Sequence, residues 1–84
     1  MYKNRGPEGR CNLCGGTVAR LRKEMQPKLS QRGLADLLQL KGLDVDKNAV
    51  QRIESGQRFV TDIELKVLAE VFHTSTDALL QKEE

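Results

Sequence analysis

The sequence predicts an all-α domain of five short helices and no strand, on three observations. Apolar residues make up 38% of the 84-residue chain and Trp is absent. This composition suits packed short helices better than a β-sandwich, which needs more β-branched and aromatic side chains. Apolar positions recur at intervals of three and four residues, which is helical spacing. Most of these segments follow Ser, Thr, Asp or Asn, the residues that cap helices.

The length allows one domain with a small core. Residues 1–11 are polar, glycine-rich and charged, and we expect them to form a flexible N-terminal tail. The helical domain is expected over residues 12–80, and residues 81–84 are expected to form a solvated C-terminal tail.

The first helix is expected to begin at Leu13 or Thr17 and to end near Met25, before a proline. Its apolar residues fall on one helical stripe, at Cys14, Val18, Leu21 and Met25. Asn12 could cap the early start and Thr17 the later one. The pair Gly15–Gly16 weakens the early start, because each glycine costs about 1 kcal/mol inside a helix.

The second helix is expected to begin after Ser30, whose side chain is a good cap. Leu29 and Leu34 hold the positions of a hydrophobic staple around it. The buried stripe then comprises Leu34, Ala35, Leu37 and Leu38. Gly33 stands where a better helix former is expected, so the first turn should be weak.

The third helix is expected to follow a turn at Gly42 and Asp44. Asp46 is in position to cap its start. Gly56 stands at its end, where a left-handed conformation usually terminates a helix.

The fourth helix begins with a T-x-x-E capping box formed by Thr61 and Glu64. Helical spacing continues through Leu65, Leu68, Ala69 and Phe72. His73, the only histidine, is expected to cap the end of this helix. Ser75 then opens a short fifth helix.

Charge is distributed unevenly along the chain. The net charge is +2, but residues 1–58 hold 12 Lys/Arg against 6 Asp/Glu, whereas residues 59–84 hold 2 against 6. A basic part and an acidic part suit a protein that faces a polyanion with one surface, although many solvated domains are also lopsided. No apolar run is long enough for a membrane helix or a signal peptide, so we expect a cytoplasmic protein without a membrane partner.

The residue types of catalytic sites do not fall into a catalytic pattern. Ser30, Ser55 and Ser75 lie at expected helix ends without a nearby histidine base. No glycine-rich phosphate loop follows a strand. We therefore expect a protein that is not an enzyme and needs no cofactor.

One side of the third helix carries side chains that can recognise DNA bases. At 100° per residue, an arc of about 140° holds the polar residues Lys47, Asn48, Gln51 and Arg52. The opposite side holds Ala49, Val50 and Ile53. Arg and Lys match the two acceptors of guanine, and Asn or Gln matches the acceptor and donor of adenine. A polar outer face is, however, also usual for an ordinary amphipathic helix.

From about Thr17 to Leu80 the chain resembles the XRE-type helix-turn-helix family of phage Cro proteins and repressors. The stretches that carry the resemblance are VARLRKEM, LSQRGLADLL, VDKNAVQRIESGQR and TDIELKVLAEVFHTSTDALL. The resemblance implies a five-helix lambda-repressor-like domain whose second and third helices form the helix-turn-helix. It also implies a homodimer that binds double-stranded DNA and regulates transcription, usually as a repressor.

The resemblance also assigns roles to residues. Positions that read bases in the major groove would be Lys47, Asn48, Gln51 and Arg52. Positions that contact the DNA backbone would be Ser30, Gln31, Gln57 and Arg58. Arg22 and Glu54 would form an internal ion pair, and Ala35 would be the small residue that lets the two motif helices approach closely. The chain departs from the family in QLKGLD, which lengthens the turn after Leu38 or extends the second helix, and in MQPK after the first helix.

Cys11 and Cys14 have the spacing of half a zinc ribbon. A closed tetrahedral site needs four ligands, and the sequence has neither a third cysteine nor a second histidine. We therefore expect no metal site within one chain, and Cys14 fits the apolar stripe of the first helix. Zinc shared by two chains and a redox switch are the alternatives.

DNA binding also has a rival of another class. An antitoxin-like module that binds a protein partner can carry the same fold. Such a module should need an exposed apolar patch, and the first and last ten residues offer little of one.

Overall fold

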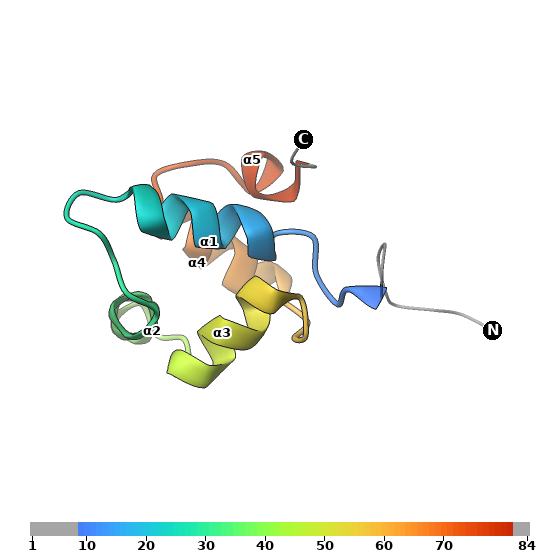
Figure 1. The fold of residues 1–84 in the computed structure, drawn as a ribbon, viewed down its shortest axis with the longest axis horizontal. Coiled ribbons are helices and arrows are strands. Elements are labelled where there is room, and N and C mark those ends of the chain that lie inside the picture. The colour runs from blue at the N-terminus through green and yellow to red at the C-terminus, as the bar shows by residue number, and fades with distance from the viewer. Residues whose placement is uncertain (1–8, 82–84) are drawn as a thin grey trace.

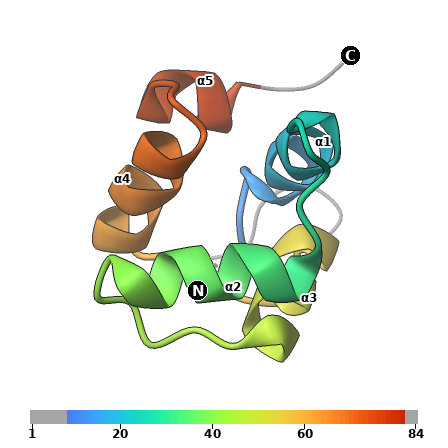
Figure 2. The same cartoon turned by 90° about the vertical axis from the view of Figure 1, so that its left-hand side faces the viewer.

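The computed structural model describes residues 9–81 and confirms an all-α fold within them. Its five helices are α1 (Gly15–Glu24), α2 (Gln31–Leu40), α3 (Lys47–Ser55), α4 (Asp62–Val71) and α5 (Thr76–Leu80). In Figure 1, α3 lies beneath α1 and beside α2, which is viewed end-on, and α5 lies at the opposite end of the molecule. Figure 2 shows α4 and α5 on one side and α1 on the other, with α2 running across the lower part of the view.

The core lies where the five helices converge. Its largest fully buried side chains are Leu34, Leu38, Ile53, Leu68, Leu79, Val18, Val45, Val50 and Cys14. Val18, Leu34, Leu38 and Leu68 lie on the stripes that helical spacing predicts, because a short helix buries only the stripe that faces its neighbours, whereas Val45 lies in the segment between α2 and α3. Ala35 is also buried, on the helix that packs against α3.

The expected caps are confirmed for four helices. The side chain of Ser30 accepts a hydrogen bond from the backbone N–H of Gly33, and Asp46 and Ser75 cap α3 and α5 in the same way. Thr61 and its partner three residues later form the complete capping box of α4. Gly56 ends α3 with φ of +82°, the left-handed conformation that glycine adopts without strain. These interactions span only a few residues, which is why the sequence predicts them.

The start of α1 differs from the expectation that two glycines disfavour an early start. The helix begins at Gly15, whose N–H donates to the Oδ1 atom of Asn12. A Cβ at position 15 would lie 2.1 Å from the backbone oxygen of Ile53, so glycine is required where α1 meets α3. The gain from this close approach offsets the helix propensity that glycine lacks.

The connection from α2 to α3 is long for two reasons. α2 continues to Leu40, and a six-residue segment, 41–46, then leads into α3. Gly42 turns the chain with φ of +92°, and the Gln39 side chain donates to the backbone oxygen of Val45 at 2.8 Å. Both alternatives that QLKGLD left open, a longer turn and an extended helix, are therefore present.

Two further positions have roles that the sequence analysis does not give them. A Cβ at Gly33 would lie 2.9 Å from the Cδ1 atom of Leu29, so glycine leaves room for the side chain that packs over the first turn of α2. His73 terminates α4 through its main chain, with φ of +54° and its N–H bonded to the backbone oxygen of Glu70. The backbone of His73, and not its side chain, therefore makes the hydrogen bond at the end of α4.

Candidate functional site

α3 exposes one polar face and buries the other. Each residue of the predicted base-contacting set is exposed: Lys47, Asn48, Gln51 and Arg52. Ala49, Val50 and Ile53 are buried against the rest of the domain. The structure therefore brings the four polar side chains together on one outward surface, as the helical spacing predicts. We call this set the α3 face.

Glu54, at the inner edge of the α3 face, is hydrogen bonded to residues of both α1 and α2. Its carboxylate accepts hydrogen bonds from Arg22 Nε at 2.6 Å and Nη2 at 3.0 Å, and from Gln31 Nε2 at 2.9 Å. The Arg22 and Glu54 side chains are only 12% and 8% exposed. Arg22 also donates to the backbone oxygen of Leu29 at 3.0 Å, which anchors the connection between α1 and α2. The ion pair that the resemblance implies is present, and it sets the position of α3 relative to α1 and α2.

The same ion pair affects the protonation of Arg22. The hydrogen bond to Glu54 raises the pKa of the Arg22 guanidinium above its ordinary value, and burial opposes that effect. Arg22 therefore remains charged at neutral pH.

The residues expected to contact a DNA backbone differ in how available they are. Ser30 is exposed, and its hydroxyl can still donate while it accepts from Gly33. Gln57 is exposed beyond the end of α3. Gln31 uses one amide N–H for Glu54 and retains the other, so it can donate only one further hydrogen bond.

Arg58 is engaged inside the protein. Its Nη1 and Nη2 atoms each donate to a carboxylate oxygen of Glu64 at 3.0 Å, and Nη1 also donates to the backbone oxygen of Phe59. The two charged side chains are 27% and 15% exposed. The hydrogen bond to Glu64 raises the pKa of Arg58, and the hydrogen bond from Arg58 lowers the pKa of Glu64. A contact from Arg58 to DNA would therefore have to compete with this pair, which the sequence does not reveal.

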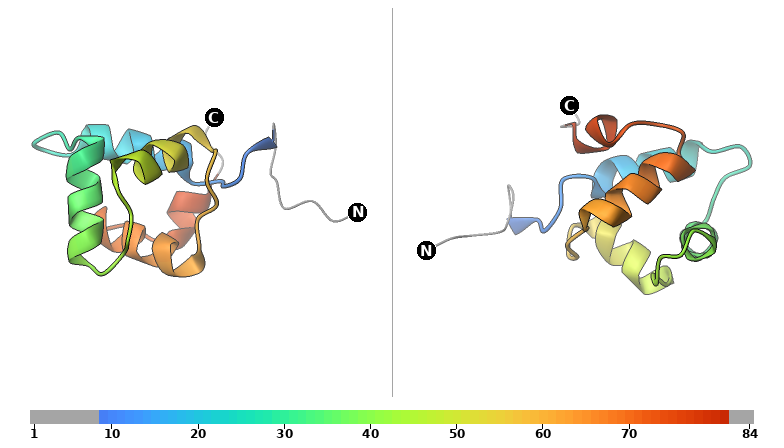
Figure 3. Two further views of the ribbon diagram at one scale, coloured as in Figure 1. Left: turned by 90° about the horizontal axis from the view of Figure 1, so that it is seen from below. Right: turned by 180° about the vertical axis from the view of Figure 1, so that it is seen from behind.

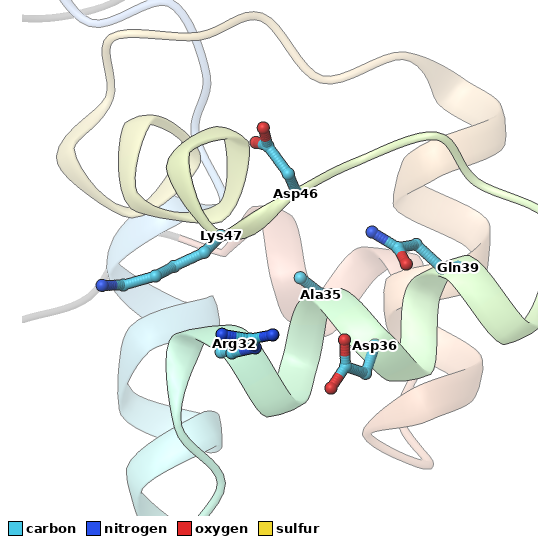
Figure 4. A pocket seen from close by; sticks show the side chains of 6 residues that line it. All are labelled: Arg32, Ala35, Asp36, Gln39, Asp46 and Lys47. Carbon is cyan, nitrogen blue, oxygen red and sulfur yellow. The ribbon is translucent and has the colours of Figure 1, made fainter.

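A hollow of about 290 Å³ separates α2 from the start of α3. Figure 4 shows Asp46 and Lys47 on one side of it and Arg32, Asp36 and Gln39 on α2 at the other. Its lining mixes two cations with two carboxylates, unlike the predominantly apolar pockets that hold small ligands. Arg32 is an exposed cation that was not among the residues predicted to contact DNA. Its place beside Gln31 at the start of α2 is the feature of the sequence that could have indicated it.

The cysteines lie at the start of α1. Cys14 is 1% exposed and belongs to the core, and burial raises the pKa of its thiol. Cys11 is half-buried. Within residues 9–81, no group of three Cys, His, Asp or Glu side chains is arranged to hold a metal ion.

The N-terminal segment departs from the expected flexible tail. Residues 1–8 lie outside the described residues, but Arg10 and Cys11 of the expected tail, and Asn12 at the start of the expected domain, hydrogen bond to the C-terminal end of α3 or to the loop after it. These contacts join residues more than 40 positions apart. No local pattern in the sequence signals them.

Comparison of the chain with protein-family models, curated proteins and solved structures found no match. The helices of residues 9–81 include none that is long and apolar enough to cross a membrane.

Proposed function

We propose that this protein binds double-stranded DNA sequence-specifically and inserts the α3 face into the major groove. One observation carries the proposal: Lys47, Asn48, Gln51 and Arg52 are all exposed on one side of a helix whose other side is fixed in the core. These residue types are the ones that recognise base edges in pairs of hydrogen bonds. A helix of this diameter fits the major groove.

The surroundings of α3 suit a helix that docks on a duplex. α2 packs against α3, and the exposed hydroxyl of Ser30 stands at the N-terminal end of α2, the end of a helix that favours a phosphate. The ion pair of Arg22 and Glu54, together with Gln31, fixes α3 in the domain. A rigid reading helix lowers the ordering cost of binding.

The resemblance to XRE-type regulators supports the same proposal. In this interpretation α2 and α3 form the helix-turn-helix, and the protein is a cytoplasmic transcriptional regulator, usually a repressor in that family. A domain of this size covers one half-site, so we propose a homodimer on a near-palindrome with half-sites about one DNA turn apart. Phe59 and Ile63, which follow α3 in the chain, are 52% and 67% exposed and offer apolar surface for such a dimer.

The decisive experiment selects duplexes from a random pool at physiological salt. Recovery of a palindromic motif would support a dimeric sequence-specific protein, and recovery of no motif would contradict it. Arg52→Ala is expected to weaken binding to the selected site by about 1–3 kcal/mol and binding to random DNA much less. Lys66→Ala, an exposed residue on α4, is the matched control and should leave the ratio of the two affinities unchanged.

The second candidate is an antitoxin-like module that binds a protein partner. The observation that favours it is the exposure of large apolar side chains on the surface, with Leu40 at 83% and Ile63 at 67%. Weak, salt-sensitive DNA binding without a selected motif would make this candidate the better one. Leu40 lies outside the surface proposed for the dimer, so loss of partner binding on Leu40→Asp, with the α3 face intact, would distinguish it from DNA binding.

The third candidate, regulation through zinc or thiol oxidation, has less support, because Cys14 is buried in the core. Native mass spectrometry with added zinc tests the shared site. Two chains holding one zinc ion would support it, and a protein without zinc would exclude it.

A further inference from the structure

Residues 10–12 cover the C-terminal end of α3 with hydrogen-bond donors. The backbone N–H of Cys11 donates to the oxygen of Gly56 at 2.8 Å. The Asn12 side chain donates to the oxygens of Ile53 at 3.0 Å and Arg58 at 2.7 Å. Figure 3 shows this segment, in blue, beside the yellow end of α3. The last carbonyls of a helix lack partners within the helix, and the oxygen of Ile53 also accepts from the backbone N–H of Gly56 at 3.1 Å.

Arg10 places a cation on this helix end. Its Nη2 atom lies 3.3 Å from the backbone oxygen of Glu54. Its guanidinium lies against Gly56, where an added Cβ would come within 2.7 Å of Cζ, so the absence of a side chain at Gly56 makes room for it. Among residues 9–81, the ion pairs involve other cations, and no carboxylate is paired with Arg10.

The position of Arg10 at the C-terminal end of α3 affects how that end of the helix interacts with a polyanion. The carboxyl end of a helix carries a partial negative charge, which repels a phosphate. Donors from residues 10–12 occupy these carbonyls, and the guanidinium of Arg10 adds a positive charge there. Arg58, the cation that the resemblance assigns to this loop, is instead engaged by both oxygens of Glu64.

We propose that Arg10 contacts a DNA phosphate beside the C-terminal end of α3, an inference that rests on the proposed function. Arg10 thereby supplies a backbone contact at the loop where Arg58 is paired with Glu64. A guanidinium that bonds a carbonyl through one Nη2 hydrogen retains other N–H donors for a phosphate.

Asn12 is a positioning residue in this arrangement. Its Nδ2 donates to two backbone oxygens on α3 and the following loop, and its Oδ1 accepts from Gly15 N at 2.8 Å. The amide thus connects the start of α1 to the end of α3. It therefore keeps the preceding segment, which includes Arg10, beside the end of α3. A cation held in place loses less conformational freedom on binding than one on a free chain.

The test measures how DNA affinity depends on salt. Each phosphate that a protein neutralises adds about 0.9 to the slope of log K against log salt concentration. Arg10→Gln is therefore expected to lower the slope on random-sequence duplex by about 0.9 relative to wild type. Between 50 and 200 mM salt, the wild type should then lose about 3.5-fold more affinity than the variant. Lys66→Gln removes the same charge from α4 and should retain the wild-type slope.

Arg10→Lys separates charge from packing, because it keeps the charge and loses the planar guanidinium. It should keep the wild-type slope even if Arg10→Gln destabilises the fold. A wild-type slope in Arg10→Gln, or equal slopes in Arg10→Gln and Arg10→Lys, would overturn the inference while leaving DNA binding intact. If the wild type itself binds no duplex at 50 mM salt, the proposed function fails instead.

Discussion

Replacing Glu54 with alanine tests whether the buried ion pair holds α3 in place. The carboxylate accepts three hydrogen bonds, two from Arg22 and one from Gln31, at 2.6–3.0 Å. Removing it would leave the charge of Arg22, whose side chain is 12% exposed, without its partner. Breaking such a buried pair costs about 3–5 kcal/mol, and the residual exposure places this pair near the lower figure. A domain of this size has a total stability of about 4–13 kcal/mol, so the loss is a large part of it.

The assay is thermal unfolding followed by circular dichroism, together with urea titration. In a domain of 60–100 residues, 1 kcal/mol corresponds to about 4–8 °C in Tm. Glu54→Ala is therefore expected to lower Tm by about 12–24 °C. Glu24→Ala breaks the exposed pair with Arg20, whose side chains are 50% and 59% exposed, and should cost about 0.5 kcal/mol or less.

A double-mutant cycle isolates the pair itself. Arg22→Met combined with Glu54→Met should be less destabilised than the sum of the two single changes, because the double variant leaves no unpaired buried charge. Additive losses, or a loss below 1 kcal/mol in Glu54→Ala, would refute the view that this pair fixes α3.

Two further predictions concern titratable groups. Iodoacetamide should alkylate Cys11 before Cys14 in the native protein, because Cys14 is buried and its raised pKa keeps the thiol protonated; equal rates by peptide mass spectrometry would contradict this. The hydrogen bond from Arg58 lowers the pKa of Glu64, so its stabilising contribution is present above the unfolded value of about 4.3 and disappears as the pH falls through the lower folded value. Tm measured from pH 7 to pH 2 should therefore fall less in Glu64→Gln than in wild type, and parallel curves would exclude this contribution.

Much of the local structure follows from short-range patterns. Ser30, Asp46, Thr61 and Ser75 each cap a helix by bonding an N–H three residues ahead, so cap and partner are visible together in the sequence. The exposure of Lys47, Asn48, Gln51 and Arg52 follows from the same kind of argument, because helical spacing separates them from the buried residues. The candidate base-contacting surface was therefore predictable without coordinates.

Helical spacing did not predict which of the other charged residues are free to contact a ligand. Arg58 is paired with Glu64 only because the loop after α3 brings the two side chains within 3.0 Å. Whether a loop residue faces solvent or a neighbour depends on backbone angles that its sequence does not specify.

The sequence by itself determined five helices, the caps of four of them and the polar face of α3, because each depends on residues within about one helical turn. Only the tertiary structure decided that residues 10–12 cover the end of α3 and that Gly15 is needed where α1 meets it. Those contacts join positions about 40 residues apart, so they depend on how the helices cross. The same packing bonds Arg10 to the end of α3 and pairs Arg58 with Glu64, and it therefore influences which cations can contact a ligand.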